Sequence, residues 1–151
     1  MKRYFSEERG NIAVLFAFVF IVLVGMAAMA TDIGLLAIKR ARLMEIGQIM
    51  RDARFEQSQL IWEADDPAQK FDEIVREYGI KNGLRDDQIQ TEYTTVENSR
   101  TRRECKVVMK FTDTYKCTTL RLFGLNEVPI KVTINGSAYE QNSNGVWSPG
   151  R

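Results

Sequence analysis

The chain has 151 residues, of which 44% are apolar and 27% charged, a composition typical of a folded domain that excludes wholesale disorder. Its 21 Lys and Arg side chains nearly balance 20 Asp and Glu side chains, so the net charge does not indicate a nucleic-acid-binding protein. Histidine is absent from the sequence, which excludes histidine-based catalysis and imidazole metal sites.

A segment without charged residues runs from Asn11 to Thr31, after a short basic N-terminus at residues 1–10. As a helix its 21 residues would extend about 32 Å, close to the roughly 30 Å hydrocarbon core of a bilayer. We therefore predict a single transmembrane helix over residues 11–31. The alternatives are a signal peptide cleaved near Ala30, for which the segment is long, and a buried core helix, for which the rest of the chain is small.

Two charged features bear on this helix. Asp32 directly follows the uncharged segment. It is interpreted either as a carboxylate at the level of the lipid headgroups or as a buried polar contact with a neighbouring subunit's helix. Lys and Arg are more numerous after the span than before it, which by the positive-inside rule favours a cytoplasmic C-terminal side.

The helix is expected to continue as an amphipathic segment over residues 32–63, because no proline occurs between Asp32 and Pro67. Apolar side chains recur along it with heptad-like spacing. One row holds Leu36, Leu43 and Met50, and the second holds Ile46, Ala53 and Leu60. This stripe packs either on the protein's own globular domain or on the helices of other subunits. Gly47 is a weak point of the isolated helix.

Residues 64–141 are predicted to form a small α+β domain. Asp66 as N-cap and Pro67 as first helical residue predict a second, short helix over 67–78 that stops at Gly79. Alternating apolar residues then predict a three-stranded antiparallel sheet, with strands at 89–96, 104–112 and 128–139. Residues 118–125 form a short helix or an irregular crossover, and residues 142–151 a flexible tail.

Cys105 and Cys117 are the two cysteines of the sequence, and both fall in this domain. In a small domain outside the inner membrane such a pair predicts one disulfide. A disulfide favours a periplasmic domain, and we give it more weight than the distribution of Lys and Arg. The alternative is two free thiols in a cytosolic domain. Zinc binding is disfavoured, because the sequence has no further Cys or His to complete a site.

Motifs of catalysis and cofactor binding were sought along the whole sequence. It contains no nucleotide-binding glycine loop, nucleophile elbow, calcium loop or zinc-protease motif. Its paired carboxylates fit capping and solvated loops. We therefore expect a non-enzymatic protein without a cofactor or metal.

The order of features resembles the TadE/TadG-like pseudopilins of tight-adherence (Flp-type) pilus systems. Their N-termini look like R-G-x-x-A-V-x-F-A, followed by an apolar span, D-x-G and an Arg-rich helix. The matching residues here are Arg9, Gly10, Ala13, Val14, Phe16, Ala17, Asp32 and Gly34, and the stretch 118–140 is loosely similar to the terminal strand of that family. The resemblance implies a pilin-like α+β fold.

The resemblance also implies a location and partners. The N-terminus would be cytoplasmic, the C-terminal domain periplasmic, and the partners other pilin or pseudopilin subunits, the inner-membrane assembly machinery and lipid, with no nucleic acid. Asp32, Leu36, Leu43, Ile46 and Met50 would provide helix contacts in the assembly.

A prepilin peptidase would cleave such a chain between Gly10 and Asn11. The fifth residue of the mature chain would then be Leu15, where pilins of this kind have glutamate. The leading hypothesis is accordingly a minor pilin or assembly pseudopilin of a pilus. The alternative is a membrane-anchored periplasmic sensor or ligand-binding domain.

Overall fold

The computed structural model describes residues 4–150, with the side chains of residues 11–150. It is an α+β structure with a long N-terminal helix and an antiparallel sheet, as predicted. Residues 1–3 of the predicted cytoplasmic N-terminus lie outside the described residues. The chain forms two compact units: a stem unit, Met1–Ile38 with Tyr115–Val128, and a sheet unit, Lys39–Thr114 with Pro129–Arg151.

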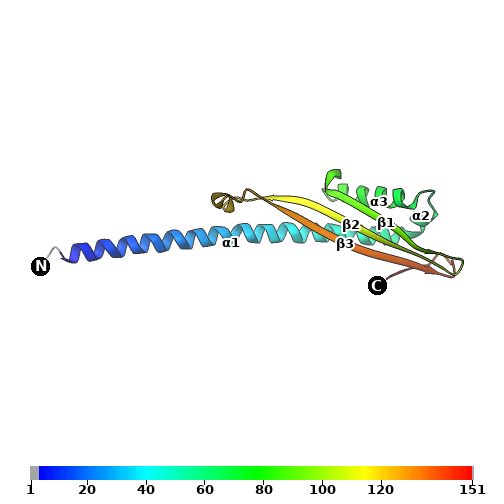
Figure 1. Cartoon of the computed structure of the whole chain (residues 1–151), viewed down its shortest axis with the longest axis horizontal. Helices are drawn as coiled ribbons and strands as arrows, with labels where there is room; N and C mark the ends of the chain where they lie inside the picture. Colours follow the sequence, from blue (N-terminus) through cyan, green and yellow to red (C-terminus); the bar gives the residue numbers. More distant parts are fainter. Residues whose placement is uncertain (1–3, 151) are drawn as a thin grey trace. The chain divides into compact units, whose positions relative to one another are not determined.

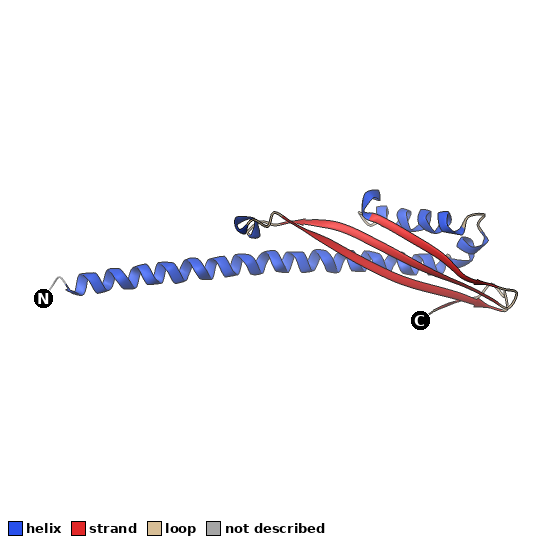
Figure 2. Cartoon of the chain, viewed as in Figure 1, coloured by secondary structure: helices blue, strands red, loops and turns tan. Residues whose placement is uncertain are grey.

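Helix α1 spans Tyr4–Glu56 and contains 53 residues, drawn as one uninterrupted helix in Figures 1 and 2. The continuation predicted to residue 63 is broken, because α1 ends before Gln57 and a separate short helix, α2, follows at Ser58–Glu63. The hydroxyl of Ser58 donates a hydrogen bond to the backbone carbonyl of Phe55 at 2.7 Å. Such bonds back to the preceding turn bend helices, which accounts for the break.

The apolar stripe of α1 packs inside the sheet unit. Leu43, Ile46, Met50 and Ala53 are buried, so the stripe packs on the protein's own domain at these four positions. Leu43, Ile46 and Met50 are therefore not available for contacts with the helices of other subunits, which was the alternative that the spacing left open.

The outer members of the stripe differ from this pattern. Leu36, which belongs to the stem unit, is half-buried. Leu60 is exposed, because it follows the break at Gln57 and Ile61 of α2 is buried in its place.

Helix α3 spans Pro67–Lys81. As predicted, the carboxylate of Asp66 caps it by accepting hydrogen bonds from two backbone N–H groups of the first turn, at 3.0 Å each. The predicted stop at Gly79 is wrong, since the helix continues beyond it. Gly79 is instead a point of close packing, because an added Cβ would lie 2.5 Å from the side chain of Ile89.

One antiparallel sheet makes up most of the remaining sheet unit. Its strands are β1 Ile89–Asn98, β2 Arg102–Lys116, β3 Glu127–Gln141 and β4 Trp147–Pro149, in the order β1-β2-β3-β4. A 3-10 turn, η1 (Asp86–Gln88), precedes β1, and a second, η2 (Leu120–Phe123), lies between β2 and β3. The three predicted strands are present, but the sheet has four strands rather than three.

The fourth strand lies in the tail that was predicted to be flexible. Trp147 packs on Trp62, with ring centroids 5.4 Å apart, and its indole N–H donates to Gln59 at 2.9 Å. The guanidinium of Arg103 lies 5.4 Å from the ring centroid of Trp62 and 5.8 Å from that of Trp147. Because Trp62 and Arg103 are remote from Trp147 in sequence, the tail alone gave no sign of these contacts.

The core of the sheet unit lies between the sheet and the helices. Alternate residues of two strands face it, as predicted: Cys105, Val107, Met109 and Phe111 of β2, and Ile130, Val132 and Ile134 of β3. Helix α1 meets this face at Gly47, where an added Cβ would lie 2.8 Å from Ile134 and 3.0 Å from the Phe111 ring. The residue that weakens the isolated helix is thus the one that allows it to approach the sheet.

Candidate functional site

The stem unit buries one carboxylate, that of Asp32, immediately after the uncharged segment of α1. Its neighbours Thr31 and Ile33 are exposed, whereas Asp32 is only 1% exposed. The connection between β2 and β3 covers it. Burying a carboxylate costs free energy unless hydrogen-bond donors surround it, so its surroundings decide what this residue does.

Five donors point at the Asp32 carboxylate, one from the end of β2 and four from the connection between β2 and β3. Oδ1 accepts from the Tyr115 hydroxyl at 2.8 Å and from the Thr118 backbone N–H at 3.1 Å. Oδ2 accepts from the backbone N–H groups of Thr119 at 2.7 Å and Leu120 at 2.8 Å, and lies 2.6 Å from Oγ1 of Thr119. We name these four donor residues the Asp32 cage.

Three of these donors are consecutive backbone N–H groups at the start of η2. The first N–H groups of a helix have no partner within it, and successive N–H groups form a concave site for an anion. Thr119, the N-cap residue of η2, makes no capping hydrogen bond with its own side chain. Asp32 therefore supplies, from another element, the carboxylate that caps this turn.

The cage keeps Asp32 ionised. The hydrogen bond from the Thr119 hydroxyl, followed by that from the Leu120 N–H, holds the pKa of the Asp32 carboxyl well below its ordinary value, although burial acts in the opposite direction. The same carboxylate raises the pKa of the Tyr115 hydroxyl through their hydrogen bond. A carboxylate whose oxygens already accept five hydrogen bonds and whose pKa is lowered is a weak proton acceptor, so this geometry fits a fixed structural anion.

This arrangement bears on one of the two interpretations of Asp32 drawn from the sequence. The carboxylate makes its hydrogen bonds within the stem unit and so does not depend on a neighbouring subunit's helix for them. Its position at the level of the lipid headgroups stays a prediction. The sequence signal for the cage was the pair Thr118–Thr119, whose hydroxyls and N–H groups are good donors. Nothing in its spacing connected that pair to residue 32.

Three of the four cage residues, Thr118, Thr119 and Leu120, belong to a closed loop, Cys117–Asn126, which we name the tip loop, whereas Tyr115 precedes it in β2. The backbone N–H of Cys117 donates to the carbonyl of Asn126 at 2.9 Å and closes its neck. Inside the loop η2 ends at Gly124, whose φ of 86° is in the left-handed region that favours glycine. Three apolar side chains of the loop are largely exposed: Leu122 at 85%, Phe123 at 66% and Leu125 at 52%.

The uncharged segment of α1 also exposes its apolar side chains. Phe16, Ile21 and Met26 are representative of a segment in which nearly every large apolar residue is exposed. Within the part of the chain whose side chains the structure describes, one helix, α1, is long and apolar enough to cross a membrane. The candidate cleavage site between Gly10 and Asn11 lies inside α1, where the surroundings of the side chains of residues 4–10 are outside the description. Cleavage stays a prediction.

The predicted disulfide between Cys105 and Cys117 is not present: both are buried, free thiols. Cys105 lies in β2, and Cys117 directly follows Lys116, the last residue of that strand. Because the strand is extended, it separates the two cysteines by roughly 40 Å, at about 3.3 Å per residue. A disulfide requires Cα atoms within about 7 Å of each other. The thiol of Cys105 donates instead to the carbonyl of Ala138 at 3.7 Å. The orientation in the membrane therefore rests on the resemblance alone.

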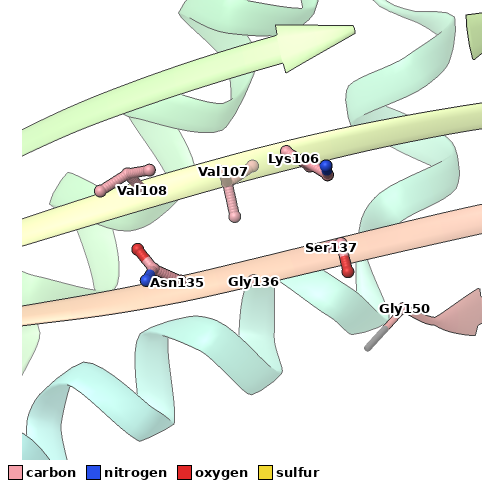
Figure 3. Close-up of a pocket in the computed structure, with 7 residues that line it drawn as sticks. All are labelled: Lys106, Val107, Val108, Asn135, Gly136, Ser137 and Gly150. Carbon is pink, nitrogen blue, oxygen red and sulfur yellow. The ribbon is translucent and has the colours of Figure 1, made fainter. Parts of the chain in front are cut away.

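The sheet unit carries a groove of about 450 Å³ between β2 and β3 (Figure 3). Its lining residues are Lys106, Val107, Val108, Asn135, Gly136, Ser137 and Gly150. Lys106 and Ser137 stand on different strands, and no hydrogen bond joins their side chains in the described structure. Among the residues whose side chains are described, no three His, Cys, Asp or Glu come together in a group that could hold a metal ion.

The sheet unit encloses two arginines to different extents, since Arg103 is half-buried and Arg54 is buried. Arg103 forms an ion pair with the fully buried carboxylate of Glu140. Arg54 is 3% exposed, and its Nε and Nη1 have no hydrogen-bond partner in the described part of the chain. Burial lowers the pKa of the Arg54 guanidinium. Arg54 is thus a buried charge without a compensating carboxylate hydrogen bond.

Comparison of the chain with protein family profiles, with curated proteins and with solved structures finds no match. The resemblance to TadE/TadG-like pseudopilins therefore depends on the N-terminal residues quoted above. The function is argued from those residues together with the geometry of α1 and the tip loop.

Proposed function

We propose that this chain is a non-catalytic, membrane-anchored minor pilin or pseudopilin that acts in the assembly or the tip of a tight-adherence (Flp or type IV-like) pilus. Residues 11–31 form the single-pass anchor in the bacterial inner membrane. Residues 1–10 are cytoplasmic, and the sheet unit is periplasmic. The observation that carries the proposal is that α1 has an uncovered apolar half and a covered amphipathic half.

The first half of α1 has an exposed apolar surface that is unfavourable in water. Its large side chains, such as Phe16 and Phe18, have no covering partner in the described structure, and its length matches the roughly 30 Å core of a bilayer. A contiguous apolar surface of this kind is a binding surface for lipid or for other apolar helices. Binding to lipid and binding to other apolar helices both fit a subunit that first resides in the membrane and then packs its helix against other subunits.

The second half of α1 is already occupied. Because Leu43, Ile46 and Met50 are buried in the sheet unit, contacts with other pilin subunits fall to the exposed residues 12–31. The amphipathic half then serves as the support on which the sheet unit is folded. This division of one helix into a free stalk and a covered support is what a pilin-like subunit requires.

Deletion of the gene tests the proposal. We expect loss of surface pili and of adherence, with both restored by the wild-type chain. A matched control is the Asp52→Asn chain, which changes an exposed carboxylate of α1 and should restore them fully. Normal piliation in the deletion strain would contradict the proposal and favour the alternative, a membrane-anchored sensor or ligand-binding domain.

Mass spectrometry of the mature N-terminus tests the anchor and the candidate prepilin peptidase together. A chain that begins at Asn11 establishes cleavage after Gly10 despite Leu15, and a chain that retains residues 1–10 excludes it. Both results keep the anchor. A chain that begins near Thr31 would show that the segment is a removed signal peptide, and the anchor would be refuted.

A further inference from the structure

The tip loop has three exposed apolar side chains, and its fold does not depend on their exposure. Its neck is closed by the Cys117–Asn126 hydrogen bond, and the Leu125 N–H donates to the Leu120 carbonyl at 3.2 Å. The loop backbone is thus held by its own hydrogen bonds and by those to Asp32, while Leu122, Phe123 and Leu125 are exposed. Three large apolar residues on a short closed loop mark a contact surface.

The loop is tied to α1 at the end of its apolar segment. Oγ1 of Thr119 lies 2.8 Å from the backbone carbonyl of Ala28 and 2.6 Å from Oδ2 of Asp32, so its single hydrogen can serve either acceptor. Ala28 lies inside the uncharged segment 11–31. At 1.5 Å per residue it is about 4.5 Å deeper along the helix than Thr31.

These contacts hold the base of the tip loop beside residues 28–32 of α1, where the proposed membrane anchor ends. An aromatic and two leucines beside that point match the boundary between headgroups and acyl chains. Arg121, which is exposed within the same loop, supplies a cation for the lipid phosphate, and long basic side chains reach the headgroups while their stems stay in apolar surroundings.

We propose that Leu122, Phe123 and Leu125 insert into the interfacial layer of the bilayer beside α1, so that the chain contacts the membrane twice. The inference rests on the proposed membrane anchoring. The occupant of the exposed tip is lipid, because Thr119 fastens the loop to Ala28 and Asp32, at the end of the uncharged segment that the proposed anchor places in the bilayer. The Asp32 cage is then the device that holds the loop at a fixed depth.

Fluorescence of a tryptophan placed in the tip loop tests this insertion. The full chain carrying Leu122→Trp is reconstituted into vesicles of phosphatidylethanolamine and phosphatidylglycerol, with or without lipids brominated on the upper acyl-chain carbons. Since Trp62 and Trp147 also emit, the emission of the parent chain is subtracted. We expect the added emission to be blue-shifted and mostly lost with brominated lipid. Ile80→Trp, at an exposed position of α3 in the sheet unit, is the control and should keep its emission.

Other results overturn the inference. Added emission that survives brominated lipid but is quenched by aqueous iodide would place the tip in water. Added emission quenched by neither would place it against protein, such as a second copy of this chain. Leu125→Trp repeats the measurement in case Leu122→Trp perturbs the loop.

A third variant separates this inference from the anchor. Phe16→Trp places a tryptophan in the middle of the uncharged segment. Quenching of Phe16→Trp by brominated lipid without quenching of Leu122→Trp overturns only the tip insertion. Failure of both to be quenched overturns the anchor and, with it, the insertion.

Discussion

The hydroxyl of Thr119 lies 2.6 Å from the carboxylate of Asp32, a residue 87 positions earlier in the chain. This contact, with the four other donors of the cage, joins the connection between β2 and β3 to the end of the apolar helix. A buried carboxylate with so many donors stabilises its loop only while it is ionised. The charge of Asp32 is therefore a structural element of the stem unit.

Replacing Asp32 by Asn should open the tip loop. The amide keeps the shape of the carboxylate but presents an NH₂ group to N–H donors and removes the charge that strengthens their bonds. We expect trypsin to cleave after the exposed Arg121 roughly tenfold faster in Asp32→Asn, because charge-assisted hydrogen bonds hold the loop closed. Digestion of the detergent-solubilised chain followed by mass spectrometry gives the rate. Asp52→Asn should match the wild type, and equal rates for all three chains would contradict the role of the cage.

The contribution of Asp32 should depend on pH in one direction. Its folded-state pKa is below the unfolded value of 3.8, so its stabilisation is fully present above the unfolded pKa and is lost as pH falls through the folded pKa. We expect the Tm difference between the wild type and Asp32→Asn to be constant from about pH 7 to about pH 5 and to shrink below about pH 4. Thermal unfolding in detergent measures it. A difference that disappears already near neutral pH would show that the pKa is not lowered.

The two ends of the apolar stripe should respond oppositely to truncation. Met50 is completely buried, so Met50→Ala should lower the free energy of unfolding by about 2–5 kcal/mol. Leu60 is exposed, and Leu60→Ala should change it by no more than about 0.5 kcal/mol. Urea unfolding followed by circular dichroism gives both values. A large loss for Leu60→Ala would mean that the stripe continues across the break at Gln57.

The buried Arg54 and the half-buried Arg103 should respond differently to replacement. Arg54→Met removes a buried charge that lacks a hydrogen-bonded carboxylate, so we expect the free energy of unfolding to stay unchanged or rise by about 1 kcal/mol. Arg103→Met leaves the buried Glu140 without its ion-pair partner and should cost about 3–5 kcal/mol. Urea unfolding again measures the difference. Comparable losses in both variants would show that Arg54 has a stabilising partner after all.

Both cysteines should remain thiols after expression in an oxidising compartment. Their separation along β2 prevents an intramolecular disulfide in the folded chain. We expect two reactive thiols after denaturation and the same Tm with and without a reducing agent. A thiol assay on the denatured chain and parallel melting curves check this. A lower Tm in the reduced sample would indicate a disulfide and a different course for β2.

Features with a local signal were predictable from the sequence. The uncharged segment, the Asp66–Pro67 start of α3 and the alternation of β2 and β3 each depend on residues close together in the chain. The burial of Met50 and Ile46 followed from their spacing, although the spacing did not say whether the covering surface belonged to this chain or to another. Whether the stripe is covered by this chain depends on the sheet, whose strands come from residues far from α1 in the sequence.

Features made by remote residues were not predictable in the same way. The cage joins residue 32 to residues 115–120, and β4 is held by the packing of Trp147 on Trp62. The presence of two cysteines suggested a disulfide, but the number of cysteines does not show that an extended strand separates them. The bend after Glu56 depends on the Ser58 hydroxyl reaching back to Phe55, a competition between side chain and backbone that apolar spacing does not reveal.

The number of surface pili per cell, counted by electron microscopy, tests the proposed role most directly. The deletion strain is complemented either with the wild-type chain or with residues 32–151 exported behind a cleavable signal peptide. We predict that the wild-type chain restores the pili and that the exported chain without its anchor does not, although it accumulates. Wild-type numbers of pili in the uncomplemented deletion strain would contradict the account.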